Sequence, residues 1–165
     1  MAEDRPNFDP LGLLATLDGH RVAYIVIGAF ARVVQGAEEI TRGVDIVPST
    51  KPENLKRLEV ALSDLDARRV DGREVELADV NDQVVELSTS RGVLKVVPEP
   101  AGTRGYDDLR RAATREPLGR GLRPPVASVD DLARMLAALG REEDQVKLRA
   151  LRILAELEPG RGLEV

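Results

Sequence analysis

The chain has 165 residues, 42% of them apolar, and a formal net charge of −5, which suits one compact domain with a sizeable core. It contains only two Phe and two Tyr and no Trp, which argues against a surface built on base stacking. The absence of cysteine excludes disulfides and thiolate metal sites, and a single histidine excludes a multi-histidine zinc site within one chain. The acidic balance gives no overall attraction to nucleic acid or to an anionic membrane.

No apolar run approaches the roughly 20 residues that a helix needs to cross a bilayer, and the N-terminus lacks the apolar core of a signal peptide. We therefore expect a cytoplasmic protein without a membrane partner. One stretch, residues 104–123, departs from the acidic balance because its arginines outnumber its acids. A solvated helix and loop is the simplest interpretation, and a nucleotide or RNA partner is the alternative. The arginines are Arg104, Arg110, Arg111, Arg115, Arg120 and Arg123.

The first third of the chain predicts helix, strand, helix and strand in turn. Asp9-Pro10 is a typical start for a short helix. Residues 22–27 form a continuous apolar run rich in β-branched side chains, as in a central strand buried on both faces. A glycine follows at once, then a short helix over 29–35 and a second strand over 44–47.

The middle of the chain predicts one helix and then a sheet region. Thr50 is the expected N-cap and Pro52 lies in the first turn, followed by leucines at helical spacing. Short strands are expected over 73–77, 83–87 and 92–97, because turn residues separate these segments.

The last part of the chain predicts helices: one over 106–113, a loop over 119–125, a helix capped by Ser128, and a final helix over about 141–156. This order of elements predicts an α/β (α+β) domain with a mixed β-sheet flanked by helices.

We expect residues 1–125 to form the α/β core. Residues 126–165 are expected to form a C-terminal helical segment of the same domain, packed alongside the core. No repeat or low-complexity tract interrupts this organisation.

An ordered series of small residues and one carboxylate surrounds the first two predicted strands. It runs Gly28-Ala29-Phe30-Ala31, then Gly36, then Thr41-Arg42-Gly43-Val44-Asp45. This series resembles the nucleotidyltransferase superfamily, above all its bacterial minimal and toxin-associated members, whose pattern is Gly-Gly-x-Ala, Gly and Thr-x-Asp-x-Asp. The segments 106–109, 126–135 and 140–144 look like the C-terminal helices of that family, so the resemblance spans roughly residues 20–155.

The resemblance implies transfer of a nucleotidyl group from a nucleoside triphosphate by in-line attack. Two magnesium ions then stabilise the attacking and leaving oxygens, held by two acids spaced i, i+2 on a strand and a third on a neighbouring strand. A glycine turn lets backbone amides approach phosphate. The residues that the resemblance places at the nucleotide are Gly28, Ala29, Thr41, Arg42, Arg141 and Asp144.

The sequence departs from this pattern at the acids. Gly43 stands at the first acid position, Asp45 at the second, and Lys95 at the third. Leu136 stands where the family often has a lysine, and Ala29 replaces the second glycine of the loop. One carboxylate does not assemble a two-ion clamp.

Other acids are weak substitutes. Glu38 and Glu39 precede the strand, Asp79 and Asp82 lie in predicted turns, and none has the required spacing on a strand. Glu86 lies on a predicted strand and is the best substitute ligand, although one polar residue in an alternating strand needs no such role.

Lys95 suggests a specific hypothesis: its ammonium replaces the metal and forms a salt bridge with Asp45, since a partly buried lone carboxylate is costly without a partner. Magnesium would then be a cofactor only if the protein is active, and no cofactor is expected if it is degenerate.

Three functions remain open. The favoured one is a catalytically degenerate nucleotidyltransferase-like protein that binds a nucleotide, RNA or protein partner. The second is an active metal-dependent enzyme that transfers a nucleotide to tRNA, protein or a small molecule, with Asp45 at its centre and Glu86 and Asp144 as further acids. The third is a toxin–antitoxin-type interaction protein that uses the Leu148/Leu151 face of its last helix.

Overall fold

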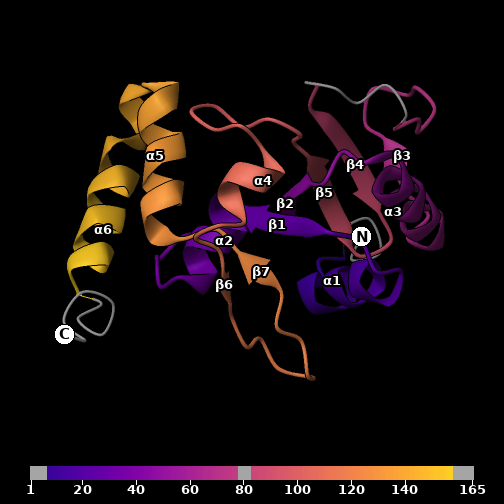
Figure 1. The fold of residues 1–165 in the computed structure, drawn as a ribbon, viewed down its shortest axis with the longest axis horizontal. Coiled ribbons are helices and arrows are strands. Elements are labelled where there is room, and N and C mark those ends of the chain that lie inside the picture. Colours follow the sequence, from indigo (N-terminus) through magenta and orange to yellow (C-terminus); the bar gives the residue numbers. More distant parts are fainter. Residues whose placement is uncertain (1–6, 78–82, 158–165) are drawn as a thin grey trace, which may run out of the picture.

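The computed structural model describes residues 7–77 and 83–157, and in these residues helices surround one seven-stranded sheet (Figure 1). The helices are α1 (Pro10–Gly19), α2 (Gly28–Val34), α3 (Pro52–Asp64), α4 (Tyr106–Leu109), α5 (Val129–Leu139), the 3₁₀ turn η2 (Glu142–Asp144) and α6 (Gln145–Glu156). The strands are β1 (Tyr24–Ile27), β2 (Gly43–Pro48), β3 (Arg68–Arg69), β4 (Val85–Thr89), β5 (Gly92–Val96), β6 (Thr114–Arg115) and β7 (Pro125–Val126).

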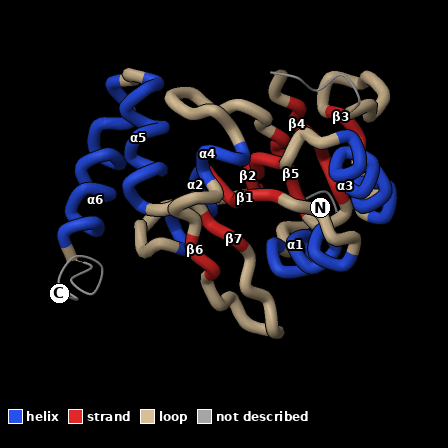
Figure 2. The backbone as a smooth tube through the Cα atoms, in the orientation of Figure 1, coloured by secondary structure: helices blue, strands red, loops and turns tan. Residues whose placement is uncertain are grey.

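The sheet is mixed, which confirms the predicted fold class. Its strand order is β3-β4-β5-β2-β1-β7-β6. β1 runs antiparallel to β2 and parallel to β7, whereas β5 runs parallel to β2 and antiparallel to β4. Figure 2 shows the strands in the middle of the molecule, with α5 and α6 at one side and α1 and α3 at the other.

One continuous hydrophobic core joins the sheet to its helices. All four residues of β1 are buried, as its unbroken apolar run predicts. In β4 the side chains alternate, since Val85 and Leu87 are buried while Glu86 is exposed. Helices α1 and α3 also contribute leucines to this core. These leucines are Leu13, Leu14, Leu17, Leu55, Leu58 and Leu62.

The two C-terminal helices lie side by side at one end of the molecule (Figure 1). α5 begins as predicted, because Ser128 Oγ accepts a hydrogen bond of 3.0 Å from Asp131 N. It ends at Gly140, which adopts the left-handed conformation. Leu148 and Leu151 of α6 are buried in the core of the chain itself. The expectation that they form an interaction face for a partner is therefore wrong.

Several local predictions differ from the structure. The segment 73–77 contains no strand, and helix α4 ends at Leu109 rather than at residue 113. The chain must be extended by Thr114, where β6 pairs with β7, and this pairing shortens the helix. Lys51, not Thr50, is the N-cap residue of α3, and no side chain caps this helix.

None of the described helices has both the length and the apolar character that crossing a membrane requires.

Candidate functional site

The candidate site is a row of side chains that crosses the centre of the sheet. Asp45 on β2 is in register with Ile27 on β1 and with Lys95 on β5. Lys95 is in turn in register with Glu86 on β4. Residues directly opposite one another on neighbouring strands point to the same face. The fold therefore brings Asp45, Lys95 and Glu86 together in one line, although they lie far apart in the sequence.

The turn at the start of α2 lies directly against this row. Gly28 has φ +75°, and a Cβ atom on it would lie 2.5 Å from Asp45 Oδ2. Both observations require glycine here, since L-residues avoid this φ and any side chain would collide with the carboxylate. The Gly28 backbone and the Asp45 carboxylate thus share one wall of the site.

The half-buried carboxyl group of Asp45 has a perturbed proton affinity. Burial raises its pKa above the ordinary value, the positive charges of Lys95 and Arg32 oppose this rise, and the negative charge of Glu86 adds to it. Among the described residues the side chain of Asp45 has no hydrogen bond or ion pair. Its ionised form is therefore stabilised only by the longer-range attraction of two cations.

The ammonium of Lys95 is paired with Glu86 and not with Asp45. Lys95 Nζ lies 3.9 Å from Glu86 Oε1, and the two side chains are 44% and 45% exposed. The predicted salt bridge to Asp45 is therefore wrong within the described residues. The physical reason is desolvation, because an ammonium keeps more water beside the exposed Glu86 than beside the half-buried Asp45. An ion pair this exposed contributes little to stability.

The place of the first acid is closed by the neighbouring strand. A Cβ atom on Gly43 would lie 2.7 Å from the backbone oxygen of Val93 and 3.1 Å from its Cβ. A distance below 3 Å to a backbone atom cannot be relieved by turning a side chain. Gly43 is therefore more than a missing carboxylate, since β2 and β5 would have to separate locally to admit a side chain here.

The residues present do not fit a pair of divalent ions. Such ions lie about 3.5–4 Å apart and need several shared carboxylates. Glu86 and Asp45 are separated by β5, which places their backbones about 10 Å apart at the usual strand spacing, with Lys95 between them. The described residues contain no group of three His, Cys, Asp or Glu that could hold a metal ion. A mechanism with two magnesium ions therefore does not fit the row of Asp45, Lys95 and Glu86.

The other residues that the resemblance places at the nucleotide are only partly at this row. Ala29 follows Gly28 in the first turn of α2 and is half-buried. Thr41 Oγ1 donates a hydrogen bond of 2.8 Å to the carbonyl oxygen of Gly43, so its hydroxyl is used locally. The Arg42 side chain is exposed and extends the positive charge at the start of β2.

Arg141 and Asp144 pair with each other just before α6. Arg141 Nε donates a hydrogen bond of 2.7 Å to Asp144 Oδ2, and Asp144 is only 2% exposed. No side-chain hydrogen bond or ion pair joins either residue to Asp45 in the part of the chain that the structure describes. The pair therefore braces the connection between α5 and α6.

Glu39 is not available as a substitute acid. It accepts two hydrogen bonds from Arg32, of 2.6 Å from Nε and 3.0 Å from Nη2, and both side chains are nearly buried. Glu38 is exposed, and Asp79 and Asp82 lie outside the described residues. Leu136, where the family often has a lysine, is buried in the core.

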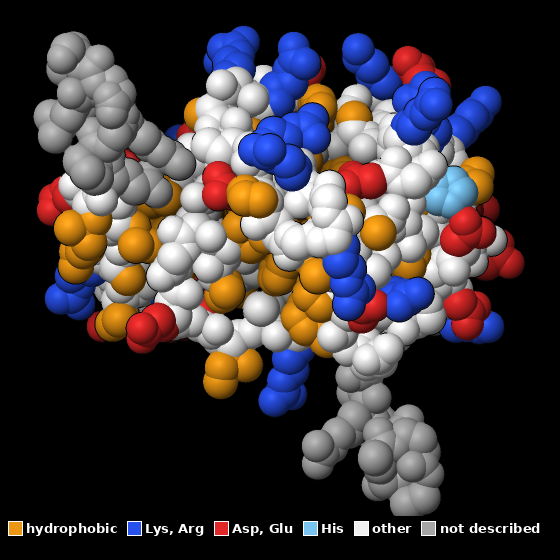
Figure 3. Space-filling view, turned by 90° about the horizontal axis from the view of Figure 1, so that it is seen from below, with side chains coloured by type: hydrophobic (Ala, Val, Ile, Leu, Met, Phe, Trp, Pro, Cys, Tyr) orange, Lys and Arg blue, Asp and Glu red, His pale blue; other side chains and the backbone are white. Residues whose placement is uncertain are grey.

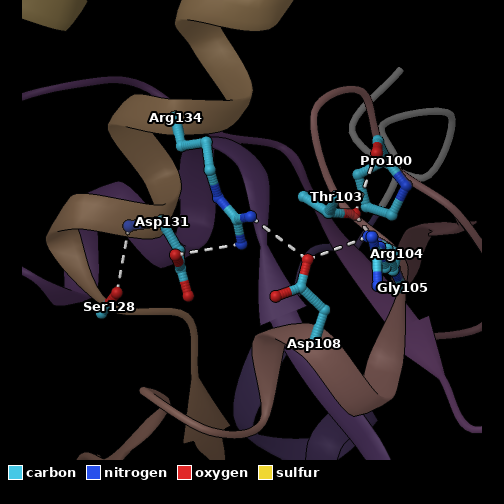
Figure 4. Close-up of polar contacts among 8 residues, drawn as sticks. All are labelled: Pro100, Thr103, Arg104, Gly105, Asp108, Ser128, Asp131 and Arg134. Atoms are coloured by element: carbon cyan, nitrogen blue, oxygen red, sulfur yellow. Dashed lines mark hydrogen bonds and ion pairs between the residues drawn. The ribbon is translucent and has the colours of Figure 1, made fainter.

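A polar cluster that the sequence did not predict joins α4 to α5 (Figure 4). Asp108 Oδ2 accepts hydrogen bonds of 2.9 Å from Arg104 N and 3.2 Å from Arg134 Nη1. Arg134 Nη2 also lies 3.1 Å from Asp131 Oδ1. The i, i+3 spacing of Asp131 and Arg134 was the only sequence signal for it. The cluster fixes α4, and the loop before it, against α5.

Comparison with known proteins identifies the fold. No family model and no curated relative matches the chain. The lincosamide antibiotic adenylyltransferase LnuA, solved with lincomycin bound, has a TM-score of 0.62 and 16% identity, over 90% of this chain and 99% of that one. TM1012 of Thermotoga maritima, a proposed nucleotidyltransferase, has a TM-score of 0.58 and 18% identity over 93% and 98%. The antibiotic-resistance factor ANT(2'')-Ia has a TM-score of 0.58 and 14% identity over 87% and 79%. The chain therefore has the nucleotidyltransferase fold.

Proposed function

We propose that this protein, which has the nucleotidyltransferase fold, binds a nucleotide through its phosphates without transferring a nucleotidyl group. The observation that carries the proposal is the register of Lys95 with Asp45. A cation stands where the resemblance implies the third acid, and a side chain at the first acid position would force β2 and β5 apart. Both changes remove metal ligands and leave the scaffold of the site intact.

The same residues suit metal-free phosphate binding. Lys95 is half exposed and its contact with Glu86 is long, so its ammonium can turn to a phosphate at little cost. Gly28 has no side chain and lets the backbone approach the ligand closely. Arg42 adds a second exposed cation near the start of β2. In this proposal Lys95 takes over charge neutralisation that divalent ions provide in a transferase.

Calorimetric titration with ATP, in the presence and in the absence of magnesium, tests the proposal. We expect binding in both conditions and a loss of about tenfold in affinity in Lys95→Ala, the scale of one charge-assisted contact. Lys56→Ala, at an exposed position on α3, is the matched control and should bind as the wild type does. Binding that requires magnesium would overturn the proposal.

An active enzyme is the second candidate, because LnuA is an adenylyltransferase whose fold this chain shares over nearly its whole length. Such an activity would depend on Asp45, with Glu86 and Asp144 as further acids. It is less well supported, since Asp144 is buried against Arg141 and β5 separates Glu86 from Asp45. Incubation with labelled nucleoside triphosphates and magnesium separates the candidates: incorporation that disappears in Asp45→Ala would establish transfer.

A protein partner of the toxin–antitoxin type is the least supported alternative, because the leucines proposed for it are buried. Exposed apolar side chains do remain on or beside α6, namely Val146, Ile153 and Leu157. On the face that Figure 3 draws, apolar side chains likewise reach the surface between charged ones.

We keep a cytoplasmic location as part of the proposal, on the sequence argument alone.

A further inference from the structure

A second candidate site lies around Tyr106, towards the opposite end of the β1–β2 pair from Asp45. Two adjoining hollows share Tyr106 and Arg110 in their walls. The larger, of about 420 Å³, is also lined by Arg111 and Arg115. The smaller, of about 280 Å³, is also lined by Lys51 and Arg57. We call the two hollows together the Tyr106 groove.

The position of the groove follows from the sheet register. Asp45 faces Ile27 at the end of β1, whereas Ala23, which lines the smaller hollow, precedes the first residue of β1. Ser49, which directly follows β2, lines the same hollow. The groove is therefore separate from the row of Asp45, Lys95 and Glu86.

The groove concentrates positive charge in an acidic protein. Its five cations face two carboxylates, Glu53 and Asp107, whereas the whole chain has a net charge of −5. The fold creates this concentration, since Lys51 and Arg57 are distant in sequence from the arginines after Tyr106. The nearest acid does not neutralise it: Arg110 Nε lies 3.8 Å from Asp107 Oδ1, and both side chains are mostly exposed.

We propose that the Tyr106 groove binds a single-stranded nucleic acid through its phosphates. Cations are distributed along both hollows, which matches the repeated phosphates of a strand, whereas a mononucleotide would occupy one hollow only. Tyr106 lies at the junction of the hollows and offers one ring for a base to stack on. Since the protein has few aromatic residues, phosphate contacts dominate the interaction and sequence preference is weak.

The groove suits a strand better than a membrane. Its cations line concave walls, whereas an anionic bilayer is a broad surface that charged side chains must protrude to reach. The proposal goes beyond nucleotide binding at Lys95 and does not depend on it, because the two sites share no residue.

Fluorescence anisotropy with labelled single strands of about 12 nucleotides tests the proposal, with one RNA arm and one DNA arm over a range of salt concentrations. The groove variant combines Arg110→Gln, Arg111→Gln and Arg115→Gln. We expect it to bind about tenfold or more weakly at low salt. Its salt slope should fall by about 2, because each phosphate that an arginine neutralises contributes about 0.7 to the slope for a single strand. Preference for RNA would point to contacts with the 2′-hydroxyl, and equal binding to phosphate contacts alone; either result supports the proposal.

The matched control removes the same charge elsewhere, with Arg68→Gln, Arg149→Gln and Arg152→Gln at exposed positions. It should bind within about twofold of the wild type, since these side chains do not line the groove. Equal weakening by the control and the groove variant would overturn the proposal, because it would show a non-specific charge effect. Failure of both the RNA and the DNA to bind at low salt would also overturn it. Binding of anionic phosphatidylserine vesicles in place of both nucleic acids would count as the same negative result.

Three single variants keep the test specific. Tyr106→Leu removes the ring and should weaken binding severalfold, whereas Tyr106→Phe keeps the ring and should not. Lys95→Ala should leave strand binding unchanged, although it weakens ATP binding if the proposed function holds. If Lys95→Ala abolished binding of the single-stranded nucleic acid, the nucleic acid would bind at the row of Asp45, Lys95 and Glu86. That result would overturn this inference. Thermal unfolding of each variant shows whether it is folded.

Discussion

The charged side chains around Arg32 and those around Asp45 are organised in opposite ways. Arg32 and Glu39 are 10% and 12% exposed and share two short hydrogen bonds. Lys95 and Glu86, by contrast, are about half exposed and 3.9 Å apart. Asp45 has a positive charge from Arg32 near it but no direct partner among the described residues. Arg32 and Glu39 therefore neutralise each other through direct hydrogen bonds, whereas the charged side chains in the row at Asp45 remain free to change partners.

The largest expected effect comes from breaking the scaffold pair. Arg32→Ala leaves the carboxylate of Glu39 nearly buried without its two hydrogen bonds, and among the described residues the ammonium of Lys147, at 4.0 Å, is then its remaining ion-pair partner. Removing one partner of such a pair costs about 3–5 kcal/mol of unfolding free energy. Urea denaturation measures this loss. Arg68→Ala, whose side chain is 80% exposed, is the control and should change stability by less than about 0.5 kcal/mol. A loss in Arg32→Ala as small as in the control would remove the contrast between the two regions.

The second prediction concerns the closed acid position. Gly43→Ala places a Cβ atom 2.7 Å from the backbone oxygen of Val93, so β2 and β5 must separate locally. We expect a loss of about 1–3 kcal/mol in unfolding free energy, the usual cost of overpacking. Gly19→Ala is the matched control, because a Cβ atom there has no neighbour within 4 Å. Equal stability of the two variants would show that an acid at position 43 is sterically possible after all.

Gly43→Asp extends this experiment to chemistry. The variant restores the i, i+2 spacing with Asp45, yet its Cβ atom would lie 2.7 Å from the backbone oxygen of Val93, so β2 and β5 must separate locally where the two acids would act. We expect no magnesium-dependent nucleotidyl transfer from this substitution, measured with labelled triphosphates. Transfer by Gly43→Asp would contradict the steric argument.

The fold was largely predictable from the sequence, because apolar runs and apolar periodicity marked β1, α3 and α5, and the capping residue Ser128 marked the start of α5. The strands β3, β6 and β7 were not, since each has two residues and two residues carry no periodic signal.

The candidate site was only partly predictable. The motif predicted that Asp45 and Lys95 face each other, because aligned strands fix which residues are opposite. The partner of Lys95 and the lack of space at Gly43 depend on the exact separation of atoms on neighbouring strands, 3.9 Å and 2.7 Å, which no residue pattern encodes.

The third prediction uses the titration of Asp45. Burial raises the pKa of this carboxyl group in the folded chain above its ordinary value of 3.8, so the folded state binds the proton more tightly than the unfolded state does. The resulting stabilisation is complete below pH 3.8 and is lost as the pH rises through the raised pKa. Asp45→Asn cannot ionise and does not suffer this loss. We therefore expect the variant to be more stable than the wild type at about pH 7, and the gain to vanish towards about pH 3.

Urea unfolding across this pH range checks the sign. Asp66→Asn is the control, because the same substitution is then made at a side chain that is 77% exposed. Parallel stability curves for Asp45→Asn and the wild type would show that the folded state does not perturb the Asp45 carboxyl group.

The smallest expected effect on stability is at the pair that faces Asp45. Lys95→Gln and Glu86→Gln each remove one charge from a half-exposed contact of 3.9 Å, so unfolding free energy should change by less than about 0.5 kcal/mol. Their effects on ATP binding should have opposite signs: Lys95→Gln removes the cation that binds phosphate, whereas Glu86→Gln removes its competitor and an anion that repels phosphate. Calorimetry of the two variants measures this difference. If Glu86→Gln weakened ATP binding as much as Lys95→Gln, the carboxylate would be part of the binding site rather than a partner that the ligand displaces.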